Sequence, residues 1–157
     1  ALEEYKKLML KLNNEVVAAA PDDLLINTHV CRGNYHSTFF SSGAYDSVAD
    51  LLFGEENVNA YYLEYDDERS GGFAPLAKVS GDKKVVLGLV TTKTPALENK
   101  ELVINRIHEA AKYVPLDRLY LSPQCGFASC EIGNKLTEEE QWAKLKLVKE
   151  IAEEVWG

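Results

Sequence analysis

The feature that most constrains the fold is the regular alternation of short buried strands with amphipathic helices along the chain. The clearest strand is the continuous Val/Leu run at Lys84–Val90, a pattern typical of parallel strands covered on both faces. Alternating strand and helix segments indicate parallel strands joined by right-handed crossovers. A chain of 157 residues also fits the usual length of one domain. We therefore expect a single α/β domain over residues 1–157.

Four strands and four helices are expected. The strands are placed at 24–29, 60–64, 84–90 and 119–121, and the helices at about 2–16, 44–53, 103–114 and 137–155. The first helix has no strand before it, and four strand–helix units are too few for a closed eight-stranded barrel, which takes roughly 250 residues. On the pattern alone, an open doubly wound parallel sheet is the default. No glycine-rich phosphate loop follows any strand, so no nucleotide site is indicated.

Charge and composition exclude several classes of partner. The formal net charge is −8, which argues against nucleic acid because phosphate backbones are bound by clustered Lys and Arg. The longest apolar run is far shorter than the roughly 20 residues of a membrane span, and the charged first residues do not resemble a signal peptide. Three cysteines are too few for a disulfide framework and favour cytosolic thiols or metal ligands. We expect a cytoplasmic protein with neither a nucleic-acid nor a membrane partner.

Residues able to bind a metal follow three of the predicted strands. In parallel α/β folds the reactive residues lie just past the carboxyl ends of the strands. His29 ends the first strand and Cys31 comes two residues later, Glu64 ends the second, and Cys125 follows the fourth. In an extended segment alternate residues share a face, so His29 and Cys31 point the same way. Zinc accepts imidazole, thiolate and carboxylate ligands, although a buried thiol beside a core histidine is the simpler interpretation of that pair.

The charge of such a zinc site indicates which chemistry it favours. Two thiolates and one carboxylate outweigh the dication and leave a formal charge of −1. A negatively charged zinc is poorly suited to activating water. It is well suited to holding another thiol as a reactive thiolate.

Four segments carry a specific combination of motifs, namely 28–34 (THVCRGN), 62–71 (YLEYDDERSG), 87–90 (LGLV) and 122–127 (SPQCGF). Together they resemble the catalytic barrel of the cobalamin-independent methionine synthases, in particular the shorter, single-barrel bacterial members. The likeness extends from about residue 20 to the C-terminus.

The resemblance implies a fold, a metal site and a reaction. It implies the C-terminal half of a (β/α)8 barrel, with zinc bound by His29, Cys31, Glu64 and Cys125. In this family the zinc holds the homocysteine thiol as a thiolate, which attacks the methyl group of polyglutamylated 5-methyltetrahydrofolate to give methionine. Glu64 is the expected ligand to loosen when the thiol enters, because it is the hard oxygen ligand among softer ones. Three further residues are candidate substrate contacts, namely Arg32, Asn34 and Asp66.

One departure from the family pattern concerns the methyl donor. The full-length methionine synthases carry a His-Ser-Pro segment whose His is implicated as the proton donor to the folate leaving group. The matching residues here are Lys93-Thr94-Pro95. Lys93 is therefore a candidate proton donor if its pKa is lowered, or a contact for a substrate carboxylate. A methylated corrinoid protein, another methylated carrier or a different electrophile remains open as the donor.

The second departure is the length. Four units supply only the metal half of the site, so we expect the isolated chain to be catalytically incomplete. The edge strands near Leu24–Thr28 and Leu119–Leu121 should be unpaired and should favour association, either with an N-terminal barrel half or with a second copy. Zinc-thiolate alkyl transfer with another donor or thiol is one alternative function. A non-catalytic zinc-binding fragment is another.

Overall fold

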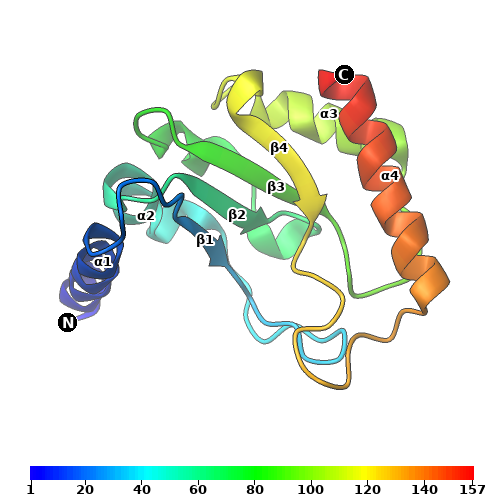
Figure 1. The fold of residues 1–157 in the computed structure, drawn as a ribbon, viewed down its shortest axis with the longest axis horizontal. Helices are drawn as coiled ribbons and strands as arrows, with labels where there is room; N and C mark the ends of the chain where they lie inside the picture. Colours follow the sequence, from blue (N-terminus) through cyan, green and yellow to red (C-terminus); the bar gives the residue numbers. More distant parts are fainter.

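The fold is one parallel sheet with helices packed on it (Figure 1). The computed structural model describes residues 1–157. The strands are β1 (Asn27–Val30), β2 (Ala60–Glu64), β3 (Lys84–Val90) and β4 (Leu119–Pro123). They lie side by side in chain order, and all three neighbouring pairs are parallel. The carboxyl ends of all four strands therefore meet at one edge of the sheet.

Four α-helices and four short 3₁₀ helices precede, connect and follow the strands. The α-helices are α1 (Leu2–Ala18), α2 (Ala49–Glu55), α3 (Lys100–Ala110) and α4 (Glu138–Trp156), and the 3₁₀ helices are η1 (Tyr45–Ser47), η2 (Glu68–Ser70), η3 (Ala74–Lys78) and η4 (Leu116–Arg118). Thr137 and Glu140 form a capping box at the start of α4. None of the helices combines the length and the hydrophobicity that crossing a bilayer requires.

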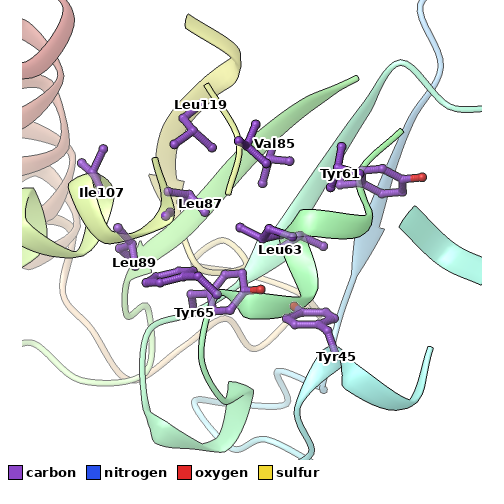
Figure 2. Close-up of a cluster of buried hydrophobic side chains, with 14 of the residues drawn as sticks. Tyr45, Tyr61, Leu63, Tyr65, Val85, Leu87, Leu89, Ile107 and Leu119 are labelled. Carbon is purple, nitrogen blue, oxygen red and sulfur yellow. The ribbon is translucent and has the colours of Figure 1, made fainter. Parts of the chain in front are cut away.

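The hydrophobic core lies between the helices and one face of the sheet. Alternate residues of a strand share a face. In β2 and β3 the residues facing the helices are odd-numbered, such as Tyr61, Leu63, Val85 and Leu87, all at most 1% exposed. They pack with side chains from α2, α3 and α4 in one cluster (Figure 2). Because each strand contributes every second residue to this core, the intervening residues point to the opposite face.

The opposite face of the sheet is open over part of its length. It forms a hollow of about 690 Å³ lined by alternate residues of the strands. Tyr62 of β2 and Tyr120 of β4 are 40% and 41% exposed there. A doubly wound sheet carries helices on both faces and reverses its strand order, so that alternative is wrong. Sequential parallel strands covered on their outer face form an arc of a barrel wall.

Three details differ from the sequence-based expectations. Leu24 and Leu25 are 54% and 73% exposed, because β1 is an edge strand that begins only at Asn27. Helix α1 buries none of its residues fully, and its apolar residues Leu2, Tyr5, Leu12 and Val16 are exposed. In α4 one of the three buried positions is a lysine: the buried side chains are those of Lys144, Leu147 and Ile151, and Lys144 forms an ion pair with Glu98.

Candidate metal centre

The four predicted zinc ligands lie together at the carboxyl edge of the sheet. His29 is in β1, Cys31 follows it, Glu64 is the last residue of β2, and Cys125 follows β4. Their potential ligand atoms all lie within 4.8 Å of one another. The parallel order of the strands produces this cluster, because residues far apart in sequence reach the same edge of the sheet.

The spacing of the two sulfur atoms fits a shared metal ion. The Sγ atoms of Cys31 and Cys125 are 3.7 Å apart, and both cysteines are free thiols. Two thiolates bound to one tetrahedral zinc at about 2.3 Å lie about 3.8 Å apart. A disulfide has a sulfur–sulfur distance of about 2.0 Å. The observed distance therefore matches a pair of metal ligands.

The imidazole of His29 is oriented by a backbone contact. Its Nδ1 lies 3.1 Å from the carbonyl oxygen of Tyr62, the residue paired with His29 in the sheet register. A carbonyl only accepts hydrogen bonds, so Nδ1 is the protonated nitrogen and Nε2 keeps its lone pair. Metal-binding histidines are usually held in this way.

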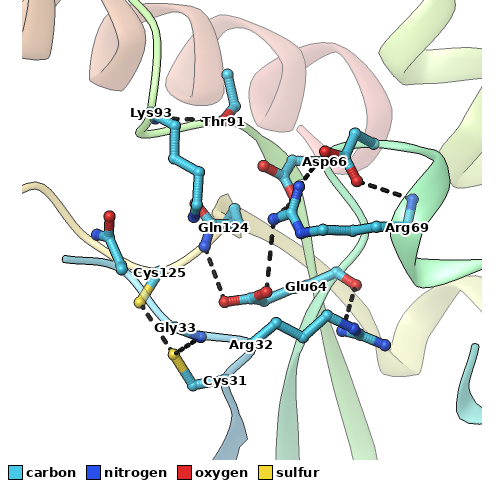
Figure 3. Close-up of polar contacts among 12 residues, drawn as sticks. Cys31, Arg32, Gly33, Glu64, Asp66, Arg69, Thr91, Lys93, Gln124 and Cys125 are labelled. Atoms are coloured by element: carbon cyan, nitrogen blue, oxygen red, sulfur yellow. Dashed lines mark hydrogen bonds and ion pairs between the residues drawn. The ribbon is translucent and has the colours of Figure 1, made fainter. Parts of the chain in front are cut away.

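The carboxylate of Glu64 is buried and has one oxygen without a hydrogen bond. Its side chain is 0% exposed. Oε1 accepts a hydrogen bond from Nε2 of Gln124 at 2.8 Å, whereas Oε2 has no hydrogen-bond partner and lies 3.5 Å from Nη2 of Arg69 (Figure 3). A buried carboxylate with an unsatisfied oxygen is costly unless a cation compensates it. Arg69 compensates part of this charge, and the carboxylate also lies within 4.8 Å of the other three potential ligand atoms, where a metal ion would compensate the rest.

The thiol of Cys31 is protonated unless a positive charge stabilises its anion. Burial raises the pKa of this thiol, and a hydrogen bond from the Gly33 backbone and the side chain of His29 lower it in part. Coordination to zinc deprotonates a thiol outright. With two sulfurs, one nitrogen and one oxygen, the donor set is of the kind that zinc accepts.

Two candidate substrate contacts hold the loops around this cluster. Nδ2 of Asn34 donates to the carbonyl of Gly126 at 3.1 Å and to Oγ of Ser129 at 3.0 Å, which ties the loop after β1 to the loop after β4. The guanidinium of Arg32 donates to the carbonyl of Gly43 at 2.6 Å and to the hydroxyl of Tyr45 at 2.8 Å. These contacts position the loops that carry Cys31 and Cys125. Substrate binding by Arg32 and Asn34 stays a prediction.

The turn after β2 forms a buried ion-pair network. Nη2 of Arg69 lies 2.7 Å from Oδ1 of Asp66, and Arg69 also pairs with Asp67. Glu68 is exposed, as expected for a solvated turn, whereas the side chain of Asp66 is 1% exposed. Burial raises the pKa of Asp66, and the nearby charge of Arg69 offsets part of that effect.

Lys93 lies on the same edge of the sheet. Its Nζ is buried and has no hydrogen-bond partner. Burial lowers the pKa of Lys93, and the negative charges of Asp66 and Glu64 act in the opposite direction. An amine of this kind is suited to proton transfer or to pairing with a substrate anion.

Sequence reasoning did not identify Gln124 as a site residue. Gln124 is 2% exposed and hydrogen-bonds the carboxylate of Glu64. The available signal was its place immediately before Cys125, where an amide follows a predicted strand at the metal-binding edge.

Comparison with known proteins places the chain in a family. The model of the catalytic domain of cobalamin-independent synthases matches residues 10–154. Bacillus subtilis YxjG, described as an uncharacterized protein, is 54% identical over 155 residues, which are 98% of this chain and 41% of the relative.

Two solved structures have a similar fold. The "putative vitamin-B12 independent methionine synthase" of Listeria monocytogenes superimposes with a TM-score of 0.74 at 42% identity, covering 97% of this chain and 41% of the other. A B12-independent methionine synthase of Shewanella sp. W3-18-1, solved in complex with selenomethionine, has a TM-score of 0.76 at 22% identity, covering 98% and 44%. The chain thus spans about two fifths of the length of these relatives. It belongs to the cobalamin-independent methionine synthase family, and its sheet is the C-terminal half of the family's catalytic barrel.

Proposed function

We propose that the chain supplies the metal half of a zinc-dependent S-methyltransferase that methylates the thiol of homocysteine to give methionine. The observation that carries this proposal is the convergence of His29, Cys31, Glu64 and Cys125, with their ligand atoms within 4.8 Å of one another. Membership in the methionine synthase family supports the assignment of homocysteine as the thiol.

The chemistry follows from the acidity of thiols. A free thiol has a pKa of about 8.5 and is mostly protonated at neutral pH, although only the thiolate is a strong nucleophile. A zinc ion held by these four residues supplies the positive charge that keeps the substrate sulfur in its thiolate form. The exposed positions of His29 and Cys31 leave this side of the cluster open to an incoming thiol.

Glu64 is the residue that we expect to give up its place to the substrate. Replacing one carboxylate by one thiolate keeps the formal charge of the site at −1, whereas adding a thiolate to the full ligand set makes it −2. The released carboxylate stays buried and needs a cation nearby. Arg69 supplies it, since its Nη2 is already 3.5 Å from Oε2 of Glu64.

Lys93 is proposed to act on the methyl donor. Its buried amine has a lowered pKa, which suits it to protonate the leaving group of the donor or to bind a donor carboxylate. Polyglutamylated 5-methyltetrahydrofolate is the donor that the family suggests. Because Lys93 stands where the full-length enzymes have His, alkyl transfer from a different methylated carrier is the second candidate.

The rest of the active site is proposed to come from strands outside this chain. The inner face of the sheet is open as a hollow of about 690 Å³, and the chain spans 41% of the length of YxjG. A preceding barrel half or a second copy of the chain would cover this face and supply contacts for the amino-acid part of homocysteine.

X-ray absorption at the zinc edge tests the proposed function. We expect two sulfur and two nitrogen or oxygen ligands for the zinc-loaded chain alone. On addition of L-homocysteine, we expect three sulfurs and the loss of one oxygen ligand. An unchanged set of zinc ligands at saturating homocysteine would contradict the proposal and favour a non-catalytic zinc-binding fragment. L-homoserine, which has a hydroxyl in place of the thiol, is the matched control ligand and should change nothing.

A further inference from the structure

Gln124 is a buried amide placed between two partners at the edge of the metal centre. It is 2% exposed. Its Nε2 donates to Oε1 of Glu64 at 2.8 Å, and its Oε1 accepts from Oγ1 of Thr92 at 2.9 Å. Figure 3 shows the amide directly above the Glu64 carboxylate. Gln124 therefore links a strand-end hydroxyl to a candidate metal ligand.

Thr92 fixes which end of the amide faces Glu64. The carboxylate accepts hydrogen bonds, so it needs the NH₂ group of Gln124. The hydroxyl of Thr92 donates to the amide oxygen, and the Thr92 backbone N–H also points to that oxygen, at 3.5 Å. With the oxygen held on the Thr92 side, the NH₂ group is held on the Glu64 side. Thr92 is itself 0% exposed, so water does not compete for these bonds.

The backbone brings Gln124 close to Glu64 because residue 88 has no side chain. Gly88 pairs with Glu64 in the register of β2 and β3. A Cβ atom on Gly88 would lie 2.8 Å from the Cα of Gln124 and 2.7 Å from the carbonyl oxygen of Leu63. Both are backbone atoms that cannot move aside cheaply. Glycine at position 88 thus allows the chain after β4 to approach the end of β2.

Gln124 is the one hydrogen-bond donor to the side-chain carboxylate of Glu64. The other polar neighbour, Arg69, stands 3.5 Å from Oε2 and is already engaged by Asp66 and Asp67. Oε2 has no hydrogen-bond partner. The position of the carboxylate relative to the two sulfurs therefore depends on the bond from Gln124.

We propose that Gln124, oriented by Thr92, is a positioning residue that holds the Glu64 carboxylate at the metal and thereby sets the metal affinity of the site. This inference rests on the proposed function, because it takes Glu64 to be a metal ligand. Partners of metal ligands typically change metal affinity 10- to 100-fold when they are removed. We expect the loss of metal affinity to result from a displaced Glu64 carboxylate and not from a general loss of structure.

The test is a double-mutant cycle on zinc affinity, measured by competition with a chromophoric chelator. Gln124→Met keeps the length of the side chain and removes the donor, and we expect it to weaken zinc binding by about 10- to 100-fold. In a Glu64→Ala background the same substitution should have no further effect, because the residue through which it acts is gone. An equal loss in both backgrounds, or no loss in either, would overturn the proposal.

Three further variants separate positioning from a general loss of structure. Thr92→Val removes only the hydroxyl and should weaken zinc binding in the same direction as Gln124→Met but less strongly. Thr92→Ser keeps the hydroxyl and should bind zinc with the wild-type affinity. Gln141→Met places the same substitution in the first turn of α4, away from the site, and should leave the affinity unchanged. If Thr92→Val binds zinc as tightly as wild type, the role of Thr92 is excluded.

The cycle also distinguishes failure of this inference from failure of the proposed function. If wild type binds zinc and Glu64→Ala weakens binding while Gln124→Met does not, only the inference fails. If wild type does not bind zinc, or Glu64→Ala binds it as tightly as wild type, the proposed metal site fails and the inference fails with it.

Discussion

At the scale of single residues, the sequence indicates the ligand types but not how they are held. His29, Cys31, Glu64 and Cys125 are predictable because parallel strands end at one edge and because their motifs resemble a family. The bond from Gln124 to Glu64 is not predictable from spacing. It depends on the register of three strands and on the direction of one amide, which only the folded chain determines.

Lys93 provides a prediction at this scale that does not depend on a metal. Burial lowers its pKa, so the folded state binds this proton less tightly than the unfolded state, and charged Lys93 costs stability below its folded pKa. Lys93→Met should raise the free energy of unfolding of the metal-free chain at neutral pH, by less than about 1 kcal/mol after solvent screening. The difference should shrink as the pH rises through the lowered pKa of Lys93 towards the ordinary value for lysine.

Urea denaturation of both proteins between pH 7 and pH 10 measures this difference. Lys112→Met, at an exposed position after α3, is the matched control and should show no such pH dependence. If the difference in the free energy of unfolding between Lys93→Met and wild type grows with pH, the lowered pKa of Lys93 is contradicted.

At the scale of elements, hydrophobic patterning predicts the interior better than the edges. The Val/Leu run of β3 is buried at six of its seven positions, as its composition indicates. Leu24 and Leu25 have the same apolar character but are exposed, because the chain offers no neighbouring strand on that side. Helix α1 shows a related effect, since it packs on α2 along one side only and leaves Leu2, Leu12 and Val16 exposed.

The close contact between β3 and the chain after β4 gives a prediction at this scale. Gly88→Ala places a methyl group within 2.8 Å of two backbone atoms, and overpacking of this kind typically costs about 1–3 kcal/mol. We expect the free energy of unfolding to fall by that amount in chemical denaturation of the metal-free chain.

Gly72→Ala is the matched control, because nothing lies within 4 Å of a Cβ atom there. It should change stability by no more than about 0.5 kcal/mol. Equal effects of the two substitutions would exclude a specific contact at Gly88.

At the scale of the whole molecule, the sheet is half of a barrel. The sequence predicts this from the number of strand–helix units together with the family motifs. The sequence does not predict which surfaces of this half barrel remain uncovered. Those surfaces depend on which residues line the inner face of the sheet. These surfaces are the hollow with Tyr62 and Tyr120, the exposed side of α1, and the segment at Leu24 and Leu25.

Uncovered edges predict association of the isolated chain. Parallel edge strands expose unpaired backbone groups, and Leu25 beside β1 is 73% exposed. We expect sedimentation velocity to show concentration-dependent self-association, and Leu25→Glu to weaken it by placing a charge at the edge. Leu102→Glu, at a position 64% exposed on α3, is the matched control. A monomer at every concentration, or equal effects of the two substitutions, would contradict the prediction.

The most direct measurement is the zinc content of the chain purified without added metal, compared between wild type, Cys125→Ser and Cys130→Ser. If His29, Cys31, Glu64 and Cys125 form the metal centre, wild type should carry about one zinc per chain. Cys130→Ser should keep that zinc, and Cys125→Ser should lose most of it. Absence of zinc from wild type, or equal zinc in the two variants, would contradict the metal centre on which the proposed function rests.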